Sequence, residues 1–133
     1  MPPARNLRAA MAGTSRIVAF VDDDPGARKA FRRLLAACGY EVLVYESAER
    51  FLSCSAAQSA SCLILDVHLG DGMSGIALGE TLARAERRPV PIIFMTASDD
   101  PAVRERAIGL GCVAYLKKPF SADELNAALL NAG

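Results

Sequence analysis

Short apolar runs alternate along this chain with longer stretches in which apolar residues recur at a helical period. The apolar runs are rich in β-branched residues and have the length of a strand, so we predict a strand at each of them. Their nearly continuous hydrophobicity is typical of strands that are covered on both faces of a sheet. The predicted strands are Ile17–Val21, Val42–Tyr45, Cys62–Leu65, Ile92–Met95 and Cys112–Leu116.

The stretches between the strands predict five helices. Asp24 and Pro25 supply a cap and a first-turn proline to the first helix, and Ser121 with Glu124 forms a capping-box pattern at the last. Because strands that alternate with helices form parallel sheets with right-handed crossovers, we predict an α/β three-layer sandwich with a five-stranded sheet of order 2-1-3-4-5. The predicted helices are Ala27–Cys38, Ser47–Ser53, Gly75–Arg84, Pro101–Gly109 and Ser121–Asn131.

The composition limits the number of domains and the kinds of partner that the protein can have. The chain has 133 residues, which allows one domain, and its 15 Lys and Arg residues balance 15 Asp and Glu residues. Because there is no basic excess and no Trp, we expect no direct contact with nucleic acid. The apolar runs are too short to span a bilayer, so we expect no membrane segment. The cysteines lack the C-x-x-C spacing of metal sites, and reduced thiols in apolar runs favour a cytoplasmic location.

The two ends of the chain are less informative. Residues 1–14 contain arginines but no continuous apolar segment, so we predict a disordered tail, with Met11 as an alternative start, and a single domain over 15–133. The chain stops with its last predicted helix. We therefore expect either a stand-alone domain that acts through protein contacts or a fragment of a longer protein.

Polar residues follow the predicted strands at their carboxyl ends, where parallel α/β sheets bind ligands. Asp22 and Asp23 follow the first strand, and Asp66 follows the third. Thr96 follows the fourth strand, and Lys118 lies just beyond the fifth. Several carboxylates in one cleft require a cation, and oxygen ligands without Cys or His favour Mg2+. With Lys118 and Thr96 to bind phosphoryl oxygens, Asp66 is the best candidate to attack phosphorus and form an aspartyl phosphate.

Four segments that carry these residues resemble, in the same order, the receiver domain of two-component response regulators. They read FVDDDP at 20–25, LILDVHL at 63–69, IIFMTAS at 92–98 and YLKKPF at 115–120. The resemblance covers nearly all of the chain from Ser15 onward, and SAERFL at 47–52 is closest in wording to receivers of the FixJ and NarL type. It implies a CheY-like fold and a phosphorelay signalling protein that is not an enzyme.

The resemblance also implies a role for each residue that matches the family's motifs. Asp66 would be the phosphoacceptor, assisted by Thr96 and Lys118. Thr96 and Tyr115 would be the switch residues, which move when Asp66 is phosphorylated. The implied Mg2+ ligands are Asp22, Asp23, Asp66 and the backbone carbonyl of His68. Asp24 is better explained as a helix cap than as a metal ligand.

The implied partners follow from the same resemblance. The phosphoryl donor would be a sensor histidine kinase or a histidine phosphotransfer protein. Phosphorylation would change a face that binds a downstream protein, built from Pro101–Gly109, Cys112–Leu116 and Ser121–Asn131. A homodimer formed on phosphorylation is a further candidate.

One segment departs from the family pattern, and two other functions stay open. The loop after Asp66 has Gly70 where proline is common and one added residue before Met73, and its glycines leave the backbone less restricted. The lifetime of the phosphoryl group can therefore differ from that of other receivers. The open alternatives are an interaction module that does not use phosphate and a phosphatase of the haloacid dehalogenase type, whose order of lysine and late acidic residues does not match this chain.

Overall fold

Strands and helices alternate along the chain as the hydrophobic pattern predicts. A computed structural model describes residues 16–85, 90–98 and 100–132, so the predicted tail at 1–14, with Met11, and the residue Ser15 lie outside the described residues. The predicted helix ends differ from the observed ends by at most two residues. In chain order the elements are β1 (Ile17–Val21), α2 (Pro25–Ala37), β2 (Glu41–Tyr45), α3 (Ala48–Ser53), η1 (Ser55–Ser59), β3 (Cys62–Asp66), α4 (Gly75–Arg84), β4 (Ile92–Thr96), α5 (Pro101–Gly109), β5 (Ala114–Lys117) and α6 (Ala122–Asn131).

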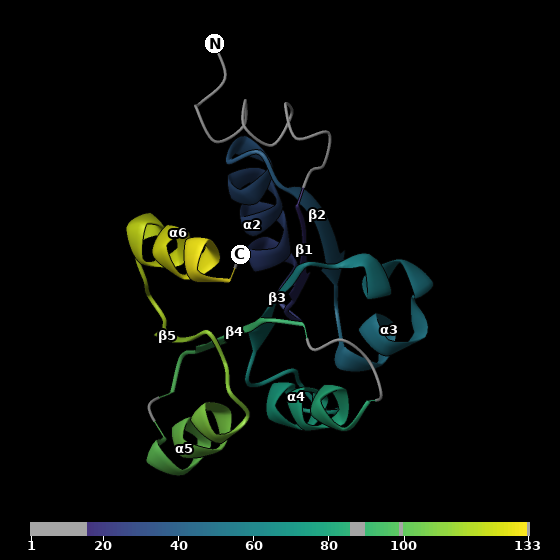
Figure 1. The fold of residues 1–133 in the computed structure, drawn as a ribbon, viewed down its shortest axis with the longest axis vertical. Coiled ribbons are helices and arrows are strands. Elements are labelled where there is room, and N and C mark those ends of the chain that lie inside the picture. Colours follow the sequence, from purple (N-terminus) through teal and green to yellow (C-terminus); the bar gives the residue numbers. More distant parts are fainter. Residues whose placement is uncertain (1–15, 86–89, 99, 133) are drawn as a thin grey trace.

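The strands form one parallel sheet in the order β2-β1-β3-β4-β5, which confirms the predicted order (Figure 1). Every residue of β3 is buried, as expected for the central strand, whereas β2 is only partly buried because it lies at an edge. Since all the strands point the same way, their carboxyl ends lie at one edge of the sheet. The residues that follow β1, β3, β4 and β5 are thereby brought to the same side of the molecule.

Helices cover both faces of the sheet and confirm the three-layer sandwich (Figure 1). On one face α2 and α6 pack through Leu35, Leu125 and Leu129. On the other face α3, α4 and α5 pack in a second cluster that includes Phe51 and Leu78. Burial of each of these large side chains contributes about 1.5–3 kcal/mol relative to exposure, so the two clusters stabilise the packing of the helices on the sheet.

Besides the shifted helix ends and one extra residue in each of β2, β3 and β4, two features differ from the prediction. The last strand is Ala114–Lys117 rather than Cys112–Leu116, although Cys112 and Val113 pack against the two core clusters. Their apolar character reflects this partial burial and does not mark the start of the strand. The short helix η1 was not predicted, because its sequence, SAAQS, has no apolar period.

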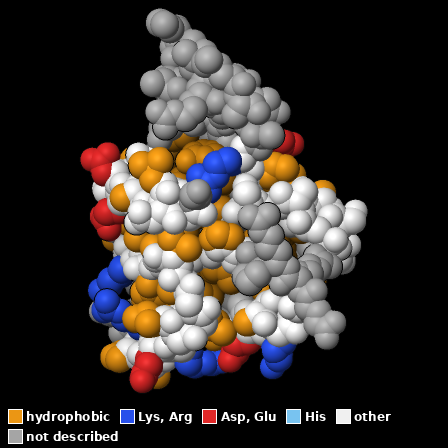
Figure 2. Space-filling model, viewed as in Figure 1, with side chains coloured by type: hydrophobic (Ala, Val, Ile, Leu, Met, Phe, Trp, Pro, Cys, Tyr) orange, Lys and Arg blue, Asp and Glu red, His pale blue; other side chains and the backbone are white. Residues whose placement is uncertain are grey.

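Charged side chains are dispersed over the face of the molecule that Figure 2 shows. Figure 2 shows small separate groups of acidic and basic side chains on the face in view, with apolar side chains between them. Within the described ranges, no helix has the length and apolar character needed to cross a membrane.

Candidate functional site

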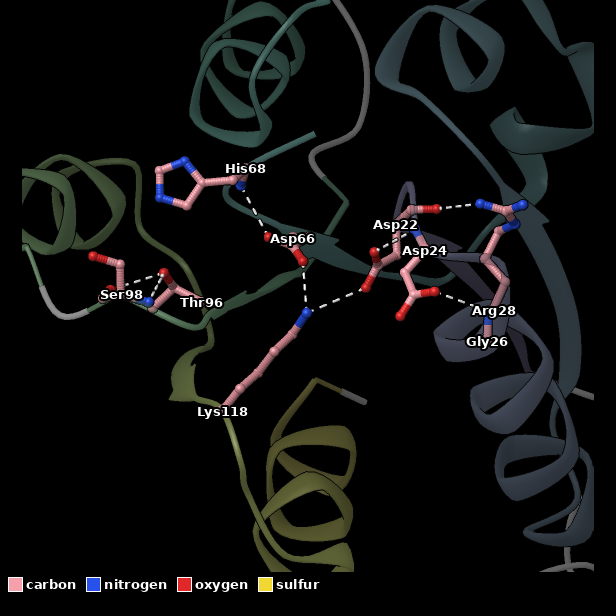
Figure 3. A network of polar contacts seen from close by, with 9 residues as sticks. All are labelled: Asp22, Asp24, Gly26, Arg28, Asp66, His68, Thr96, Ser98 and Lys118. Atoms are coloured by element: carbon pink, nitrogen blue, oxygen red, sulfur yellow. Dashed lines mark hydrogen bonds and ion pairs between the residues drawn. The ribbon is translucent and has the colours of Figure 1, made fainter. Parts of the chain in front are cut away.

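Asp66 is the last residue of β3, and its side chain is buried at the carboxyl edge of the sheet (Figure 3). Its Oδ1 accepts a hydrogen bond of 2.9 Å from the backbone N–H of His68. Its Oδ2 lies 2.6 Å from the Nζ of Lys118. Because a buried carboxylate is costly unless it is paired and hydrogen-bonded, these two contacts account for a charged group in the core of the fold.

Lys118 follows β5 and joins two buried acids. Its Nζ lies 3.3 Å from the Oδ2 of Asp22 in addition to its contact with Asp66. Its backbone N–H donates to the carbonyl oxygen of Thr96 at 2.7 Å. This bond extends the pairing of β4 and β5 and fixes the backbone from which the Lys118 side chain projects. Burial lowers the pKa of Lys118, but the hydrogen bonds and charges of Asp66 and Asp22 outweigh burial and leave the pKa above its ordinary value. The ammonium group is therefore charged at neutral pH.

Asp22 follows β1 and is held through both its side chain and its backbone. Its Oδ1 accepts from the N–H of Asp24 at 3.0 Å, and its carbonyl oxygen accepts from Nη1 of Arg28 at 2.8 Å. Its own N–H donates to the carbonyl oxygen of Tyr45 at 3.1 Å. Asp24 caps α2 by accepting from the N–H of Gly26 at 3.0 Å, which confirms the predicted cap. The turn after β1 therefore presents Asp22 in a fixed position.

Asp23, by contrast, is exposed and points toward the loop after β3. Its Oδ2 lies 3.3 Å from the position that a Cβ would take at Gly70. Among the described residues, no group of three or more Asp, Glu, His and Cys side chains is arranged to hold a metal ion. The predicted ligands are nevertheless all oxygens, which is the donor type that Mg2+ takes, and Lys118 supplies the positive charge between Asp22 and Asp66.

Thr96 is buried at the end of β4, but its hydroxyl group is turned toward its own loop. Its Oγ1 donates to the carbonyl oxygen of Ser98 at 2.8 Å and accepts from the N–H of Ser98 at 3.1 Å. Figure 3 shows this pair to one side of the contact between Asp66 and Lys118. The structure therefore places the predicted switch hydroxyl near the other residues without joining it to Asp66.

Tyr115 and His68 lie at the margins of the site. Tyr115, in β5, is partly buried and packs against the cluster that contains Phe94 and Ala107. The side chain of His68 is exposed, and its ring points away from Asp66 in Figure 3. The backbone of His68 contacts Asp66 through its N–H, while its predicted use of the carbonyl oxygen stays a prediction.

Three residues at or beside the site were not predicted from the sequence. Arg28, one turn into α2 beyond the cap, holds the carbonyl oxygen of Asp22, and its place on the helix was the available signal. A Cβ at Gly75 would overlap the backbone carbonyl oxygen of Asp66. Glu49 accepts a hydrogen bond of 2.8 Å from the N–H of Met73, 24 residues away, and no local signal indicated it.

Comparison with known proteins identifies the family of the chain. The family model of the response regulator receiver domain matches residues 18–130. The chain belongs to this family. This receiver is 38% identical over 121 residues to Nodulation protein W of Bradyrhizobium diazoefficiens, and the match covers 91% of the receiver and 52% of that protein. It is 34% identical over 112 residues to Transcriptional regulatory protein FixJ of the same organism, covering 84% of the receiver and 54% of FixJ.

A solved structure gives the same result. The receiver matches the crystal structure of FixJ-N with a TM-score of 0.79 and 28% sequence identity, covering 90% of the receiver and 94% of that chain. The predicted resemblance to FixJ-type receivers is therefore confirmed in sequence and in fold. The receiver spans about half the length of the curated relatives it matches.

Proposed function

We propose that this receiver accepts a phosphoryl group on Asp66 from a sensor histidine kinase or a histidine phosphotransfer protein. The observation that carries the proposal is the contact of 2.6 Å between Lys118 Nζ and Asp66 Oδ2. It supports the proposal because it places a cation with several N–H donors beside a buried carboxylate, where a phosphoryl oxygen needs one. Membership in a two-component signalling family supports the same reaction.

In the proposed transfer, a carboxylate oxygen of Asp66 attacks the phosphorus of the donor phosphohistidine. The P–N bond breaks as the new P–O bond forms, and the electron pair of the broken bond returns to the imidazole nitrogen. Lys118 then exchanges its contact with Asp66 for a phosphoryl oxygen, while its contact with Asp22 keeps the ammonium at the site. The N–H of His68 continues to hold the other end of the carboxyl group.

The proposed ligands of Mg2+ are Asp22, Asp23, Asp66 and the backbone carbonyl of His68. When bound, the ion supplies positive charge to the phosphoryl oxygens. Asp23 suits this role because it is exposed, so that a hydrated ion can reach it from solvent. Asp22 and Asp66 supply buried oxygens that already face a positive charge on Lys118.

Thr96 and Tyr115 are the proposed switch residues. Thr96 uses both hydrogen bonds of its hydroxyl on Ser98 in the unphosphorylated chain, and we expect it to donate to a phosphoryl oxygen once Asp66 is modified. The change would pass to α5 and α6, which flank β5 (Figure 1). On these helices Ile108 and Leu130 are 57% and 59% exposed, and exposed apolar side chains suit a downstream protein or a second copy of the receiver.

The receiver would therefore act as a signalling protein in the cytoplasm, not as an enzyme. One alternative keeps support from a specific observation: a phosphate-independent interaction module is favoured by the departure at Gly70 and by the local hydrogen bonds of Thr96. A phosphatase of the haloacid dehalogenase type has no such support, because the family match is to receivers.

Intact-mass spectrometry after incubation with Mg2+ and acetyl phosphate tests the proposal. We expect one phosphoryl adduct that requires Mg2+, is lost in Asp66→Asn and is retained in Asp71→Asn, which changes an exposed acid in the neighbouring loop. A folded chain that gains no adduct would instead support the phosphate-independent module. An adduct that persists in Asp66→Asn would show that another residue is the acceptor.

A further inference from the structure

The loop between β3 and α4 contains the glycines at which this chain departs from the family pattern. Gly70 has a φ of +72°, a left-handed conformation that glycine adopts without strain. A Cβ at Gly72 would lie 2.8 and 2.9 Å from the two carboxylate oxygens of Glu49, which is closer than real side chains pack. The loop backbone at Gly72 therefore passes directly against the carboxylate of Glu49 in α3, and that carboxylate would have to shift if residue 72 carried a Cβ.

Glu49 lies in the first turn of α3 and holds the loop through a hydrogen bond. Its Oε2 accepts from the backbone N–H of Met73 at 2.8 Å. This bond lowers the pKa of Glu49, so the carboxylate is ionised at neutral pH and the bond is charge-assisted. The helix that carries Glu49 begins at a defined position, because Ser47 caps it by accepting from the N–H of Arg50 at 3.1 Å.

The same loop contacts the phosphorylation site at two points. At its start, the N–H of His68 donates to Asp66. Further along, Gly70 lies beside the carboxylate of Asp23, whose Oδ2 is 3.3 Å from the position of an added Cβ. A separate bond within the loop joins its two ends, because the N–H of Gly75 donates to the carbonyl oxygen of Val67 at 2.8 Å. Glu49 therefore anchors the segment of the loop between Gly70 and α4.

We propose that Glu49 is a positioning residue for the phosphorylation site: its bond to Met73 holds the loop against Asp23 and Asp66 and thereby prolongs the phosphorylated state. This inference rests on the proposed function described above. Without the bond, the glycines allow the loop to move, the N–H of His68 is held less firmly at Asp66, and water reaches the phosphoryl group more often. Loss of Glu49 therefore shortens the phosphoryl lifetime but does not abolish phosphoryl transfer.

Three variants of the full chain test this role. Glu49→Ala removes the acceptor, and Glu49→Gln retains an acceptor oxygen without the charge. Glu46→Ala is the matched control, because Glu46 is an exposed acid just before α3 that pairs with Arg50 at 3.5 Å on the helix surface. Two quantities are measured for each: the solvent exchange rate of the Met73 amide by NMR without phosphate, and the half-life of the phosphoryl adduct by intact mass after acetyl phosphate is removed.

In Glu49→Ala we expect Met73 exchange to rise about tenfold, the factor that loss of one ordinary hydrogen bond allows, and the adduct half-life to fall by about threefold or more. Glu49→Gln should lie between Glu49→Ala and the wild type, and Glu46→Ala should match the wild type. An unchanged half-life or an unchanged Met73 exchange rate in Glu49→Ala overturns the inference, as does an equal loss in Glu46→Ala. A wild-type chain that forms no adduct overturns the proposed function itself, and the role of Glu49 with it.

Discussion

Lys118 and Thr96 follow neighbouring strands of one sheet, but their side chains are held in different ways. Lys118 contacts Asp66 and Asp22, so it links the ends of β5, β3 and β1. Thr96 exchanges both of its hydrogen bonds with Ser98, two residues further along the chain. The acid–lysine side of the site, made of Asp22, Asp66 and Lys118, is thus assembled by the tertiary fold. On the hydroxyl side, the hydrogen bonds of Thr96 are all made within a single loop.

This difference suggests that the two sides of the site have different roles. A change on the acid–lysine side leaves a buried charge without its partner, which is costly. A change at Thr96 exchanges one hydrogen bond for another, which needs little free energy. A switch between two conformations requires such a group, because both states must be close in free energy. We therefore expect variants on the first side to lose phosphoryl transfer and variants on the second side to lose the response to it.

Replacement of Lys118 by alanine should have the largest effect. Because the phosphoryl group loses its cationic partner, we expect the rate of Asp66 phosphorylation by acetyl phosphate to fall about 100-fold or more in an intact-mass time course. Lys117→Ala is the control, since the neighbouring Lys117 side chain is exposed. A Lys118→Ala variant that is phosphorylated at the wild-type rate would contradict the role assigned to the acid–lysine side.

Gly75→Ala tests how closely the backbone of Asp66 is positioned. The new Cβ would overlap the Asp66 carbonyl oxygen, which cannot rotate away, so we expect the free energy of unfolding in urea to fall by about 1–3 kcal/mol. Gly109→Ala is the matched control, because nothing lies within 4 Å of its added Cβ. That variant should stay within about 1 kcal/mol of the wild type or gain stability. Equal effects of the two substitutions would show that the approach at Gly75 is not tight.

Thr96→Val tests the hydroxyl side. It removes the two bonds to Ser98 in a buried position, so we expect the free energy of unfolding to fall by about 1–2 kcal/mol. Asp66 should still gain a phosphoryl group, whereas the NMR shift changes on α5, β5 and α6 that follow phosphorylation should be lost. Thr96→Ser keeps the hydroxyl and should retain them. Shift changes of wild-type size in Thr96→Val would show that the hydroxyl is not the switch.

The pH dependence of stability should give the smallest effect. The pKa of Lys118 is raised in the folded chain, so its contribution to stability is complete below the ordinary value of 10.5 and is lost as the pH rises through the higher folded pKa. The difference in unfolding free energy between the wild type and Lys118→Met should therefore be constant from neutral pH to mildly alkaline pH and change above it. A pH series of urea unfolding curves measures this difference. A difference that does not change in the alkaline range would contradict the raised pKa.

The sequence was sufficient to predict which residues meet on the acid–lysine side. Parallel strands align their carboxyl ends, so Asp22, Asp66 and Lys118 had to lie at one edge of the sheet once the strands were recognised. The same rule predicted that Thr96 would lie near them. It could not predict the direction of the Thr96 hydroxyl, which depends on the path of the loop through Ser98.

Other features depend on distances that packing sets and local sequence does not encode. Glu49 and Met73 are 24 residues apart, and only the placement of α3 against the loop after β3 brings them together. Gly75 is recognisable as the start of a helix, but its close approach to Asp66 is a tertiary contact. The sequence pattern predicts too early a start for β5, because Val113 is apolar and packs in the core without belonging to the strand.

Phosphoryl transfer to Asp66 can be tested by locating the modified residue in the chain. Borohydride reduces an aspartyl phosphate to homoserine, so a receiver treated with Mg2+ and acetyl phosphate, reduced, digested and sequenced by fragment mass spectrometry should contain homoserine at position 66. Homoserine at Asp22 or Asp23 would contradict the assignment of the acceptor. Its absence from every acidic position in a folded chain that also forms no phosphoryl adduct would contradict phosphoryl transfer altogether.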